Sequence, residues 1–213
     1  MDYNAILEQS FKKSYEEGLD LWTKDQFLND HVKKYAELIG NHTPRKVLDI
    51  GTGKAQNSHV FLEEGHEFTG IDIAEQKEWK VIKSNFPEKA KFFKVNFLEW
   101  EGYKEEFTDV LDVGCLHHQE YRKIPEYFKK INELLTEDGK FFLIVAAFEE
   151  DKLDQRLHRV EKLPSGKIRN RFNTCELHCL LNEVFDIESM QRIHNKKRNR
   201  YLIKVIAKKR CLN

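Results

Sequence analysis

The feature that most constrains the fold is a regular alternation of two patterns between residues 46 and 147. Short apolar runs, each the length of a buried strand, alternate with segments whose apolar residues recur at helical spacing. This alternation predicts parallel strands joined by right-handed crossover helices that cover both faces of a sheet. The predicted strands are residues 46–50, 67–73, 91–95, 107–113 and 140–147, and the predicted helices are residues 54–64, 75–85 and 124–135, the last followed by a turn over 136–139.

The two ends of the chain follow other patterns. Apolar residues at helical spacing predict helices within the first 40 residues. Near the C-terminus, predicted strands at 185–193 and 201–207 are joined by a connection too short for a crossover helix, so they must be antiparallel. We therefore expect an α/β fold with a mixed, seven-stranded sheet that closes with an antiparallel hairpin.

The segment before this hairpin breaks the alternation. Its predicted elements are a short helix carrying Leu153, Leu157 and Val160, a turn over residues 162–166, and a helix capped by Asn173 or Thr174 that ends at Glu183.

Length, charge and cysteine content exclude several classes of protein. A chain of 213 residues fits one domain and can bury a core without disulfides or a structural metal. Its 36 basic and 36 acidic residues cancel, whereas nucleic-acid-binding domains usually carry a basic excess. No apolar run is long enough to span a membrane and the first residues lack a secretory signal, so we expect a cytoplasmic protein. Cys175 and Cys179 flank His178 without the further ligands of a metal site, so we expect no metal.

A glycine loop follows the first predicted strand. Gly51 and Gly53 allow the backbone to approach a ligand closely, and Asp72 comes 21 residues after Gly51, where a carboxylate can accept from both hydroxyl groups of a ribose. A dinucleotide is disfavoured because Gln56 replaces the third glycine and Asp49 would repel a pyrophosphate. A carboxylate in that position favours a cationic group such as an ammonium. Adenosine joined to a charged amino acid describes S-adenosylmethionine.

With these residues and the segment 108–118, the chain resembles the class I S-adenosylmethionine-dependent methyltransferases, in the small-molecule form of the thiopurine and tellurite-resistance enzymes. The similarity runs from about residue 45 to the C-terminus. It implies a Rossmann-like fold with an N-terminal helical lid, and one domain (1–213) made of that lid (1–44), a cofactor-binding core (45–147) and a substrate-side insertion with the terminal hairpin (148–213). The cofactor residues that the resemblance implies are Asp49, Gly51, Gly53, Asp72, Ile73, Asn96, Phe97, Asp112, Gly114 and Cys115.

The resemblance also implies an acceptor site and a reaction. We expect in-line transfer of a methyl group to an N, O or S atom of a small molecule, with S-adenosylhomocysteine as product, by a monomer or homodimer. His117 and His118 stand where a general base would stand, and the alternative is that they orient the substrate or cap the following helix. The residues expected at the substrate are Tyr15, Trp22, Leu116, His158, Arg169 and Arg171.

Three other functions stay open at this level. The first is an RNA methyltransferase, although the chain lacks the Asn/Asp-Pro-Pro-Tyr/Phe signature of amino-methylating enzymes. The second is a non-catalytic partner protein that binds the cofactor. The third is a nicotinamide oxidoreductase, which Asp49 and Gln56 disfavour.

The neutral total charge conceals two opposed parts. Residues 1–150 hold 20 basic and 29 acidic side chains, whereas residues 151–213 hold 16 basic and 7 acidic ones. The neutral total is therefore weaker evidence against a nucleic-acid-binding protein than it first suggests. The basic part includes Lys167, Arg169 and Arg171. If the substrate is anionic, Arg169 or Arg171 is the expected clamp.

Overall fold

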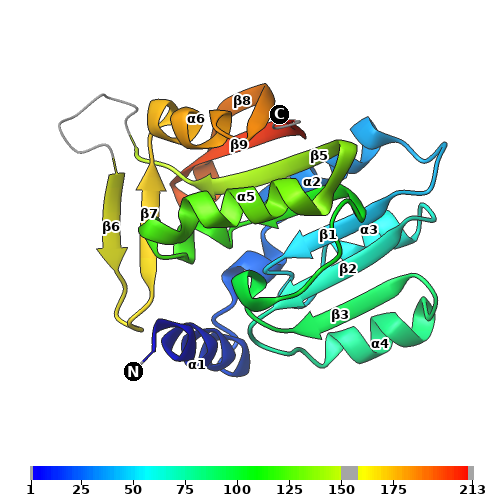
Figure 1. The fold of residues 1–213 in the computed structure, drawn as a ribbon. Coiled ribbons are helices and arrows are strands. Elements are labelled where there is room, and N and C mark those ends of the chain that lie inside the picture. Colours follow the sequence, from blue (N-terminus) through cyan, green and yellow to red (C-terminus); the bar gives the residue numbers. More distant parts are fainter. Residues whose placement is uncertain (1, 150–157, 211–213) are drawn as a thin grey trace. The chain divides into compact units, whose positions relative to one another are not determined.

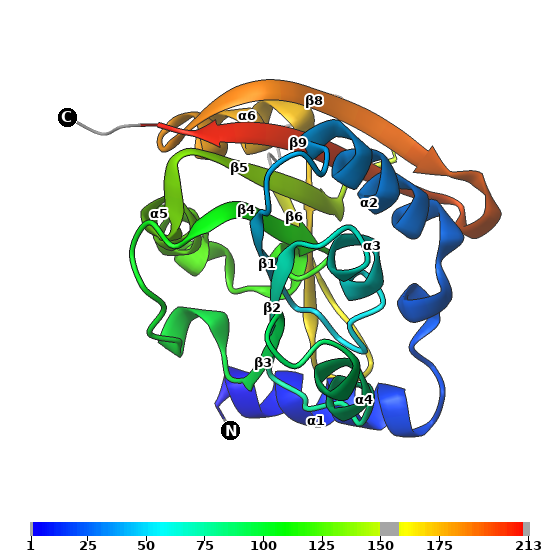
Figure 2. The ribbon, with the colours of Figure 1, turned by 90° about the vertical axis from the view of Figure 1, so that its right-hand side faces the viewer.

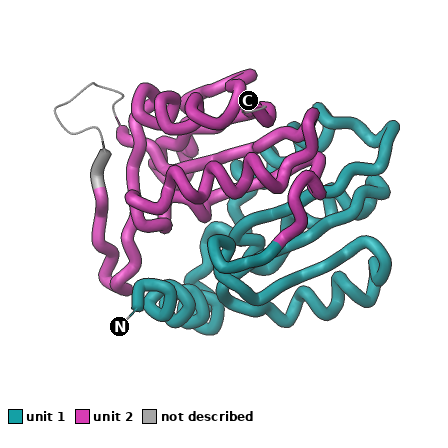
Figure 3. Tube along the Cα trace, in the orientation of Figure 1, with its two compact units in different colours: residues 1–101 teal, residues 102–213 magenta. Residues whose placement is uncertain are grey.

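The computed structural model describes residues 2–149 and 158–210. The chain divides into two compact units, residues 1–101 and residues 102–213, which Figure 3 colours separately. The division of the sequence into lid, core and insertion remains a prediction.

The first unit contains three parallel strands in the order β3-β2-β1. The strands are parallel because a helix separates each from the next, and their apolar side chains form a core in which Val47, Leu48 and Phe68 have no exposed surface. The elements of this unit are α1 (Tyr3–Glu16), η1 (Leu21–Lys24), α2 (Gln26–Ile39), β1 (Lys46–Ile50), α3 (Ser58–Leu62), β2 (Glu67–Asp72), α4 (Glu78–Asn85), β3 (Ala90–Lys94) and η2 (Phe97–Glu99).

The helix expected at 54–64 is shorter than predicted. It begins only at Ser58, because the preceding loop takes a conformation that no helix can contain. Gly51, Gly53 and Ala55 have positive φ angles of 74°, 54° and 58°. The left-handed conformation is easy for glycine and rare for alanine, so the fold holds Ala55 in it at some cost.

The second unit contains four further strands in the order β4-β5-β9-β8. β4 and β5 are parallel, whereas β9 pairs antiparallel with both β5 and β8, which confirms the predicted terminal hairpin (Figures 1 and 2). A separate antiparallel pair, β6-β7, precedes α6. The elements are β4 (Phe107–Val113), η3 (Leu116–His118), η4 (Tyr121–Lys123), α5 (Ile124–Leu134), β5 (Leu135–Ala146), β6 (His158–Lys162), β7 (Ile168–Phe172), α6 (Thr174–Asn182), β8 (Phe185–Asn195), η5 (Lys196–Arg198) and β9 (Arg200–Lys209).

The turn expected at 136–139 lies inside β5 instead. β4 and β5 are aligned at Phe107 and Leu135, and the register then shifts so that Asp109 pairs with Lys140. Such a bulge absorbs extra residues without ending the strand. The backbone folds back closely there, since a Cβ atom on Gly139 would stand 2.8 Å from the carbonyl oxygen of Thr136.

The short helix expected near residue 160 is wrong. Val160 lies in β6 and pairs with Asn170 of β7, which satisfies backbone groups that a helix would have paired locally. Leu153 and Leu157 lie outside the described residues. The predicted cap of α6 is confirmed, because the side chain of Asn173 accepts a hydrogen bond from the backbone N–H of Glu176.

The seven strands and the terminal hairpin that the sequence predicts are therefore present. Among the described residues, no helix has both the length and the apolar composition needed to cross a membrane.

Candidate functional site

The glycine loop is tied to the end of β2 by one carboxylate. Asp72 Oδ2 accepts from the backbone N–H of Gly53 at 2.9 Å, and Asp72 Oδ1 accepts from that of Ala74 at 2.9 Å. Each carboxylate oxygen has two acceptor positions, so each can still accept from one hydroxyl group. Burial raises the pKa of Asp72 to about 6, although the N–H groups of Ala74 and Gly53 favour the charged form.

A second carboxylate lies beneath the same loop. Asp49 is 1% exposed. Its Oδ2 atom accepts from Thr52 Oγ1 at 3.0 Å and from Asn57 Nδ2 at 3.4 Å. These two donors are neutral, and they fix the orientation of the carboxylate.

Two aromatic side chains from the N-terminal segment lie against the loop. A Cβ atom on Gly53 would stand 2.7 Å from the hydroxyl oxygen of Tyr15. That hydroxyl accepts from Trp22 Nε1 at 3.4 Å, and the two rings meet edge to face with centroids 5.7 Å apart. The structure thus brings together Tyr15, Trp22 and Gly53, which the sequence analysis assigned to the substrate and the cofactor separately.

Sequence reasoning missed three residues that hold this arrangement. Lys54 Nζ lies 2.7 Å from Asp20 Oδ2 and 5.5 Å from the centroid of the Tyr15 ring. Trp79 Nε1 donates to the carbonyl oxygen of Gly53 at 2.7 Å. Only the position of Lys54 next to Gly53 was a signal in the sequence, because the other two lie far from the loop along the chain.

The remaining predicted cofactor residues of the first unit lie beyond β2 and β3. Asn96 Oδ1 accepts from the backbone N–H of Leu98 at 2.9 Å and so caps η2. Phe97 is buried, whereas Ile73 and Asn96 are half-buried. Their contact with an adenine remains a prediction.

In the second unit, Asp112 organises the loop after β4. Its Oδ1 atom accepts from the backbone N–H of Cys115 at 2.8 Å, and its Oδ2 atom accepts from Leu116 N–H at 2.9 Å and from the Tyr127 hydroxyl at 2.6 Å. Burial raises the pKa of Asp112 to about 6, and these donors hold it down from a higher value. Asp112 thus positions Cys115 and Leu116, with Gly114 supplying a φ of 101° at the bend.

The two histidines lie on η3 in environments that oppose protonation. His118 Nδ1 is 2.6 Å from the carbonyl oxygen of Ile168. Burial lowers the pKa of His118 to about 3, and Lys167 and Arg169 act in the same direction. Burial also holds the pKa of His117 well below its ordinary value, together with His118 and three nearby arginines. Both rings are therefore neutral at neutral pH, and the role of either histidine as a general base stays a prediction.

The basic residues expected to clamp an anion lie on one face of β7. Arg169 and Arg171 alternate along the strand, so their side chains emerge on the same side, and Lys167 comes directly before the strand. Glu161 of β6 forms ion pairs with Arg171 at 3.1 Å and with Arg169 at 3.6 Å. The backbone of His158 pairs with Phe172, and its side chain lies outside the described residues.

Comparison with known proteins agrees with this fold. Residues 22–191 match the family model described as a methyltransferase domain. An uncharacterised methyltransferase of Schizosaccharomyces pombe is 29% identical over 106 residues, which are 49% of this chain and 72% of that protein. A putative methyltransferase of a Geobacillus strain is 27% identical over 144 residues, which are 65% of this chain and 55% of that protein.

A solved structure is similar over nearly the whole chain. It is the Burkholderia thailandensis 1,6-didemethyltoxoflavin-N1-methyltransferase with bound 1,6-didemethyltoxoflavin and S-adenosylhomocysteine. It is 29% identical, with a TM-score of 0.86, and the match covers 98% of this chain and 89% of that one. The magnesium protoporphyrin IX methyltransferase of Synechocystis shares the fold, with a TM-score of 0.69 at 16% identity. The chain therefore belongs to the methyltransferase domain family and is a class I S-adenosylmethionine-dependent methyltransferase.

Proposed function

We propose that the protein transfers the methyl group of S-adenosylmethionine to an N, O or S atom of a small molecule. The observation that carries this proposal is Asp72, a buried carboxylate that holds the glycine loop through Gly53 and keeps acceptor capacity on both oxygens. The relative bound to S-adenosylhomocysteine and a small molecule supports the same assignment.

The residues of the first unit fit this cofactor. Asp72 would accept from the ribose hydroxyls, Asp49 would attract the cationic methionine part, and Gly53 lets the backbone approach closely. Ile73, Asn96 and Phe97 are proposed at the adenine. When bound, the cofactor supplies a methyl group that its positively charged sulfur already activates. The protein itself has to position the reacting groups and exclude water.

Residues of the second unit have proposed roles of their own. We propose Gly114 and Cys115 at the methionine part, with Asp112 fixing the loop that presents them. Leu116, His117 and His118 would face the acceptor. The relative methylates N1 of its substrate, and this favours a nitrogen as the accepting atom.

An anionic acceptor is part of the proposal. Arg169 and Arg171 share a single carboxylate, Glu161, so the cluster keeps a positive excess. Arginine binds planar anions such as carboxylates through paired N–H donors. The membership of a methyltransferase family decides against a nicotinamide oxidoreductase.

Calorimetry and a turnover screen together test this function. We expect S-adenosylhomocysteine to bind and NAD not to bind, and Asp72→Ala to abolish cofactor binding. Asp186→Ala is the matched control, because Asp186 is an exposed acid that forms an ion pair with Arg210. A screen for cofactor consumption over small molecules and over RNA would identify the acceptor. Binding without turnover of any acceptor would favour the non-catalytic partner, and turnover of RNA alone would favour an RNA methyltransferase.

A further inference from the structure

Neither His117 nor His118 lies in surroundings suited to hold a further proton. His118 Nδ1 faces the carbonyl oxygen of Ile168, which can only accept, so the proton of this neutral ring sits on Nδ1. Protonating Nε2 as well would place a charge on a ring that is 8% exposed. His117 Nδ1 is buried without a hydrogen-bond partner among the described residues.

The charged groups that act on His117 among the described residues are cationic. They are Arg169 and Arg171 of β7, Arg200 of β9 and, if it were protonated, His118 of η3. Lys167 and Arg169 act on His118 in the same way. A proton taken up by either histidine would therefore join several positive charges at close range.

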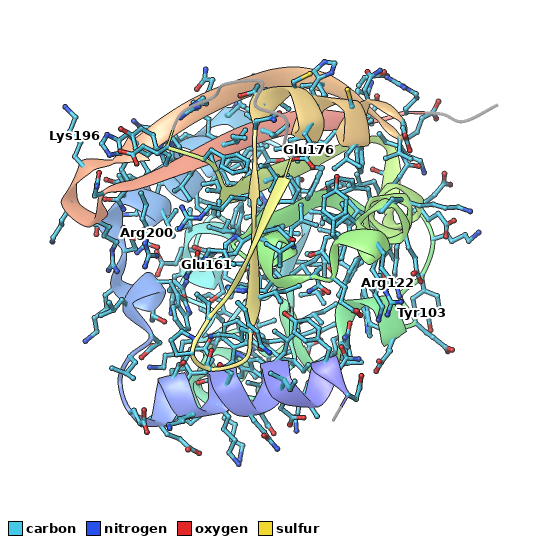
Figure 4. All side chains as sticks on the ribbon, turned by 90° about the vertical axis from the view of Figure 1, so that its left-hand side faces the viewer. Tyr103, Arg122, Glu161, Glu176, Lys196 and Arg200 are labelled. Carbon is cyan, nitrogen blue, oxygen red and sulfur yellow. The ribbon has the colours of Figure 1, made fainter. Side chains whose placement is uncertain are left out.

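The three arginines form a cluster with few counter-ions among the described residues. Glu161 pairs with Arg169 and Arg171, and no acidic side chain among the described residues forms an ion pair with Arg200. Arg200 is near enough to Arg169 to lower the pKa of that guanidinium, after the larger effect of burial. In Figure 4, Arg200 lies toward Glu161, whereas Lys196 of the same hairpin points outward.

We propose that this cluster binds the methyl acceptor as an anion whose accepting atom is already deprotonated, so that Arg169, Arg171 and Arg200 replace a general base. The inference rests on the proposed function. It assigns the acceptor to the N–H acids and makes the ionised form of the acceptor the substrate of the protein. The proton leaves to water before the transfer. A lone pair of the acceptor nitrogen then forms the bond to the methyl carbon as the carbon–sulfur bond breaks, and the electron pair of that bond stays on sulfur.

Calorimetry with chosen probes tests the preference for an anion. The probes are N–H heterocycles of graded acidity and their N-methylated neutral counterparts, titrated into the complex with S-adenosylhomocysteine at one neutral pH. We expect affinity to rise with the ionised fraction and each neutral counterpart to bind at least about tenfold more weakly. If no member of the series binds better than its neutral counterpart, the inference is overturned. Failure of S-adenosylhomocysteine itself to bind would instead overturn the proposed function.

Substitutions test which residues produce the preference for the ionised probe. Arg200→Met should weaken binding of the ionised probe about fivefold and leave cofactor affinity unchanged. Lys196→Met, which removes an exposed cation from the same hairpin, should change neither. Glu161→Gln should strengthen anion binding, and misfolding cannot produce a gain. Equal effects of the Arg200 and Lys196 variants would contradict the inference.

The pH dependence of probe binding separates arginine from histidine. The bound probe, followed by its absorbance, should lose half of its ionised form at a pH below its free pKa, and Arg200→Met should move that midpoint upward. His117→Gln and His118→Asn should leave the midpoint in place. A midpoint that disappears in a histidine variant would mean that a histidine takes the proton.

Discussion

The hydroxyl group of Tyr15 fills the space that a side chain at Gly53 would need. An added Cβ atom there would stand 2.7 Å from the hydroxyl oxygen, closer than real contacts allow. Trp22 and Lys54 hold the Tyr15 ring in place, so the ring cannot easily withdraw. The glycine loop and the N-terminal helix are therefore fitted to each other at this point.

Gly53→Ala should lower both stability and cofactor affinity. Alanine pays about 1 kcal/mol for the left-handed conformation and a further cost for displacing Tyr15. Gly18→Ala is the matched control, since Gly18 has a φ of +66° and no atom within 4 Å of an added Cβ. The double variant Gly53→Ala/Tyr15→Phe should regain the stability lost by displacing Tyr15, but not the stability lost to the left-handed conformation of alanine. Thermal unfolding and titration with S-adenosylhomocysteine measure both quantities, and equal effects of the Gly53 and Gly18 variants would contradict the fit.

Cofactor affinity should fall as the pH falls through about 6. The carboxylate of Asp72 is the form that accepts from hydroxyls, and burial raises its pKa to about 6, so acid converts it to the neutral form. Below that pH the affinity for S-adenosylhomocysteine should fall by about tenfold per pH unit. Asp72→Asn should bind weakly and with little pH dependence. If the variant kept the steep dependence, another group would be responsible, with Asp112 the first to examine.

Tyr127→Phe should destabilise the second unit by about 1.5–3 kcal/mol, because it removes a hydrogen bond to a buried carboxylate. Asp112 is unexposed, so water cannot replace the lost donor. Tyr103→Phe is the control, since Tyr103 is 79% exposed and points away from the fold in Figure 4. Unfolding in urea measures the difference. A Tyr127 variant as stable as the Tyr103 variant would show that Asp112 needs no third donor.

The unfolding free energy should rise with pH between about 3 and 6.5 through His118. The pKa of His118 is about 3 in the folded protein, whereas its ordinary value, which applies to the unfolded chain, is 6.5. Between these two pH values the histidine is protonated in the unfolded chain and neutral in the folded protein. One such proton changes stability by about 1.4 kcal/mol per pH unit. Asn at position 118 can still donate to Ile168 and cannot titrate, so His118→Asn should reduce the slope. His178→Asn, on the exposed face of α6, should leave the slope unchanged.

Burial opposes the charged form of both groups, so it lowers the pKa of His118 and raises the pKa of Asp72. An acid with a raised pKa keeps its proton in the folded state, so between about 4 and 6 the contribution of Asp72 to stability falls as the pH rises. The two contributions partly cancel in the wild-type protein. The variants His118→Asn and Asp72→Asn, each made alone, separate the two contributions.

Much of the fold could be predicted from local pattern. The strands 46–50 and 107–113 have the predicted bounds because each is a short, mostly apolar run of the length of a buried strand. The errors fall where backbone geometry overrides pattern. Ala55 in a left-handed conformation delays α3, and a bulge carries β5 through residues that resemble a turn. Val160 has helical spacing to its neighbours, but pairing with β7 decides its conformation.

The sequence by itself determined the alternation of strands and helices, the terminal hairpin, and the loop with Asp49, Gly51 and Gly53 that marks the methyltransferase family. These depend on residues close together in the chain. Only the tertiary structure decided the protonation of the histidines, because His118 meets Ile168, 50 residues away, and loses access to water there. It likewise gathered Arg200 with Arg169 from separate strands. Charge and burial act through space, and the distance between two groups in space is set only when the chain has folded.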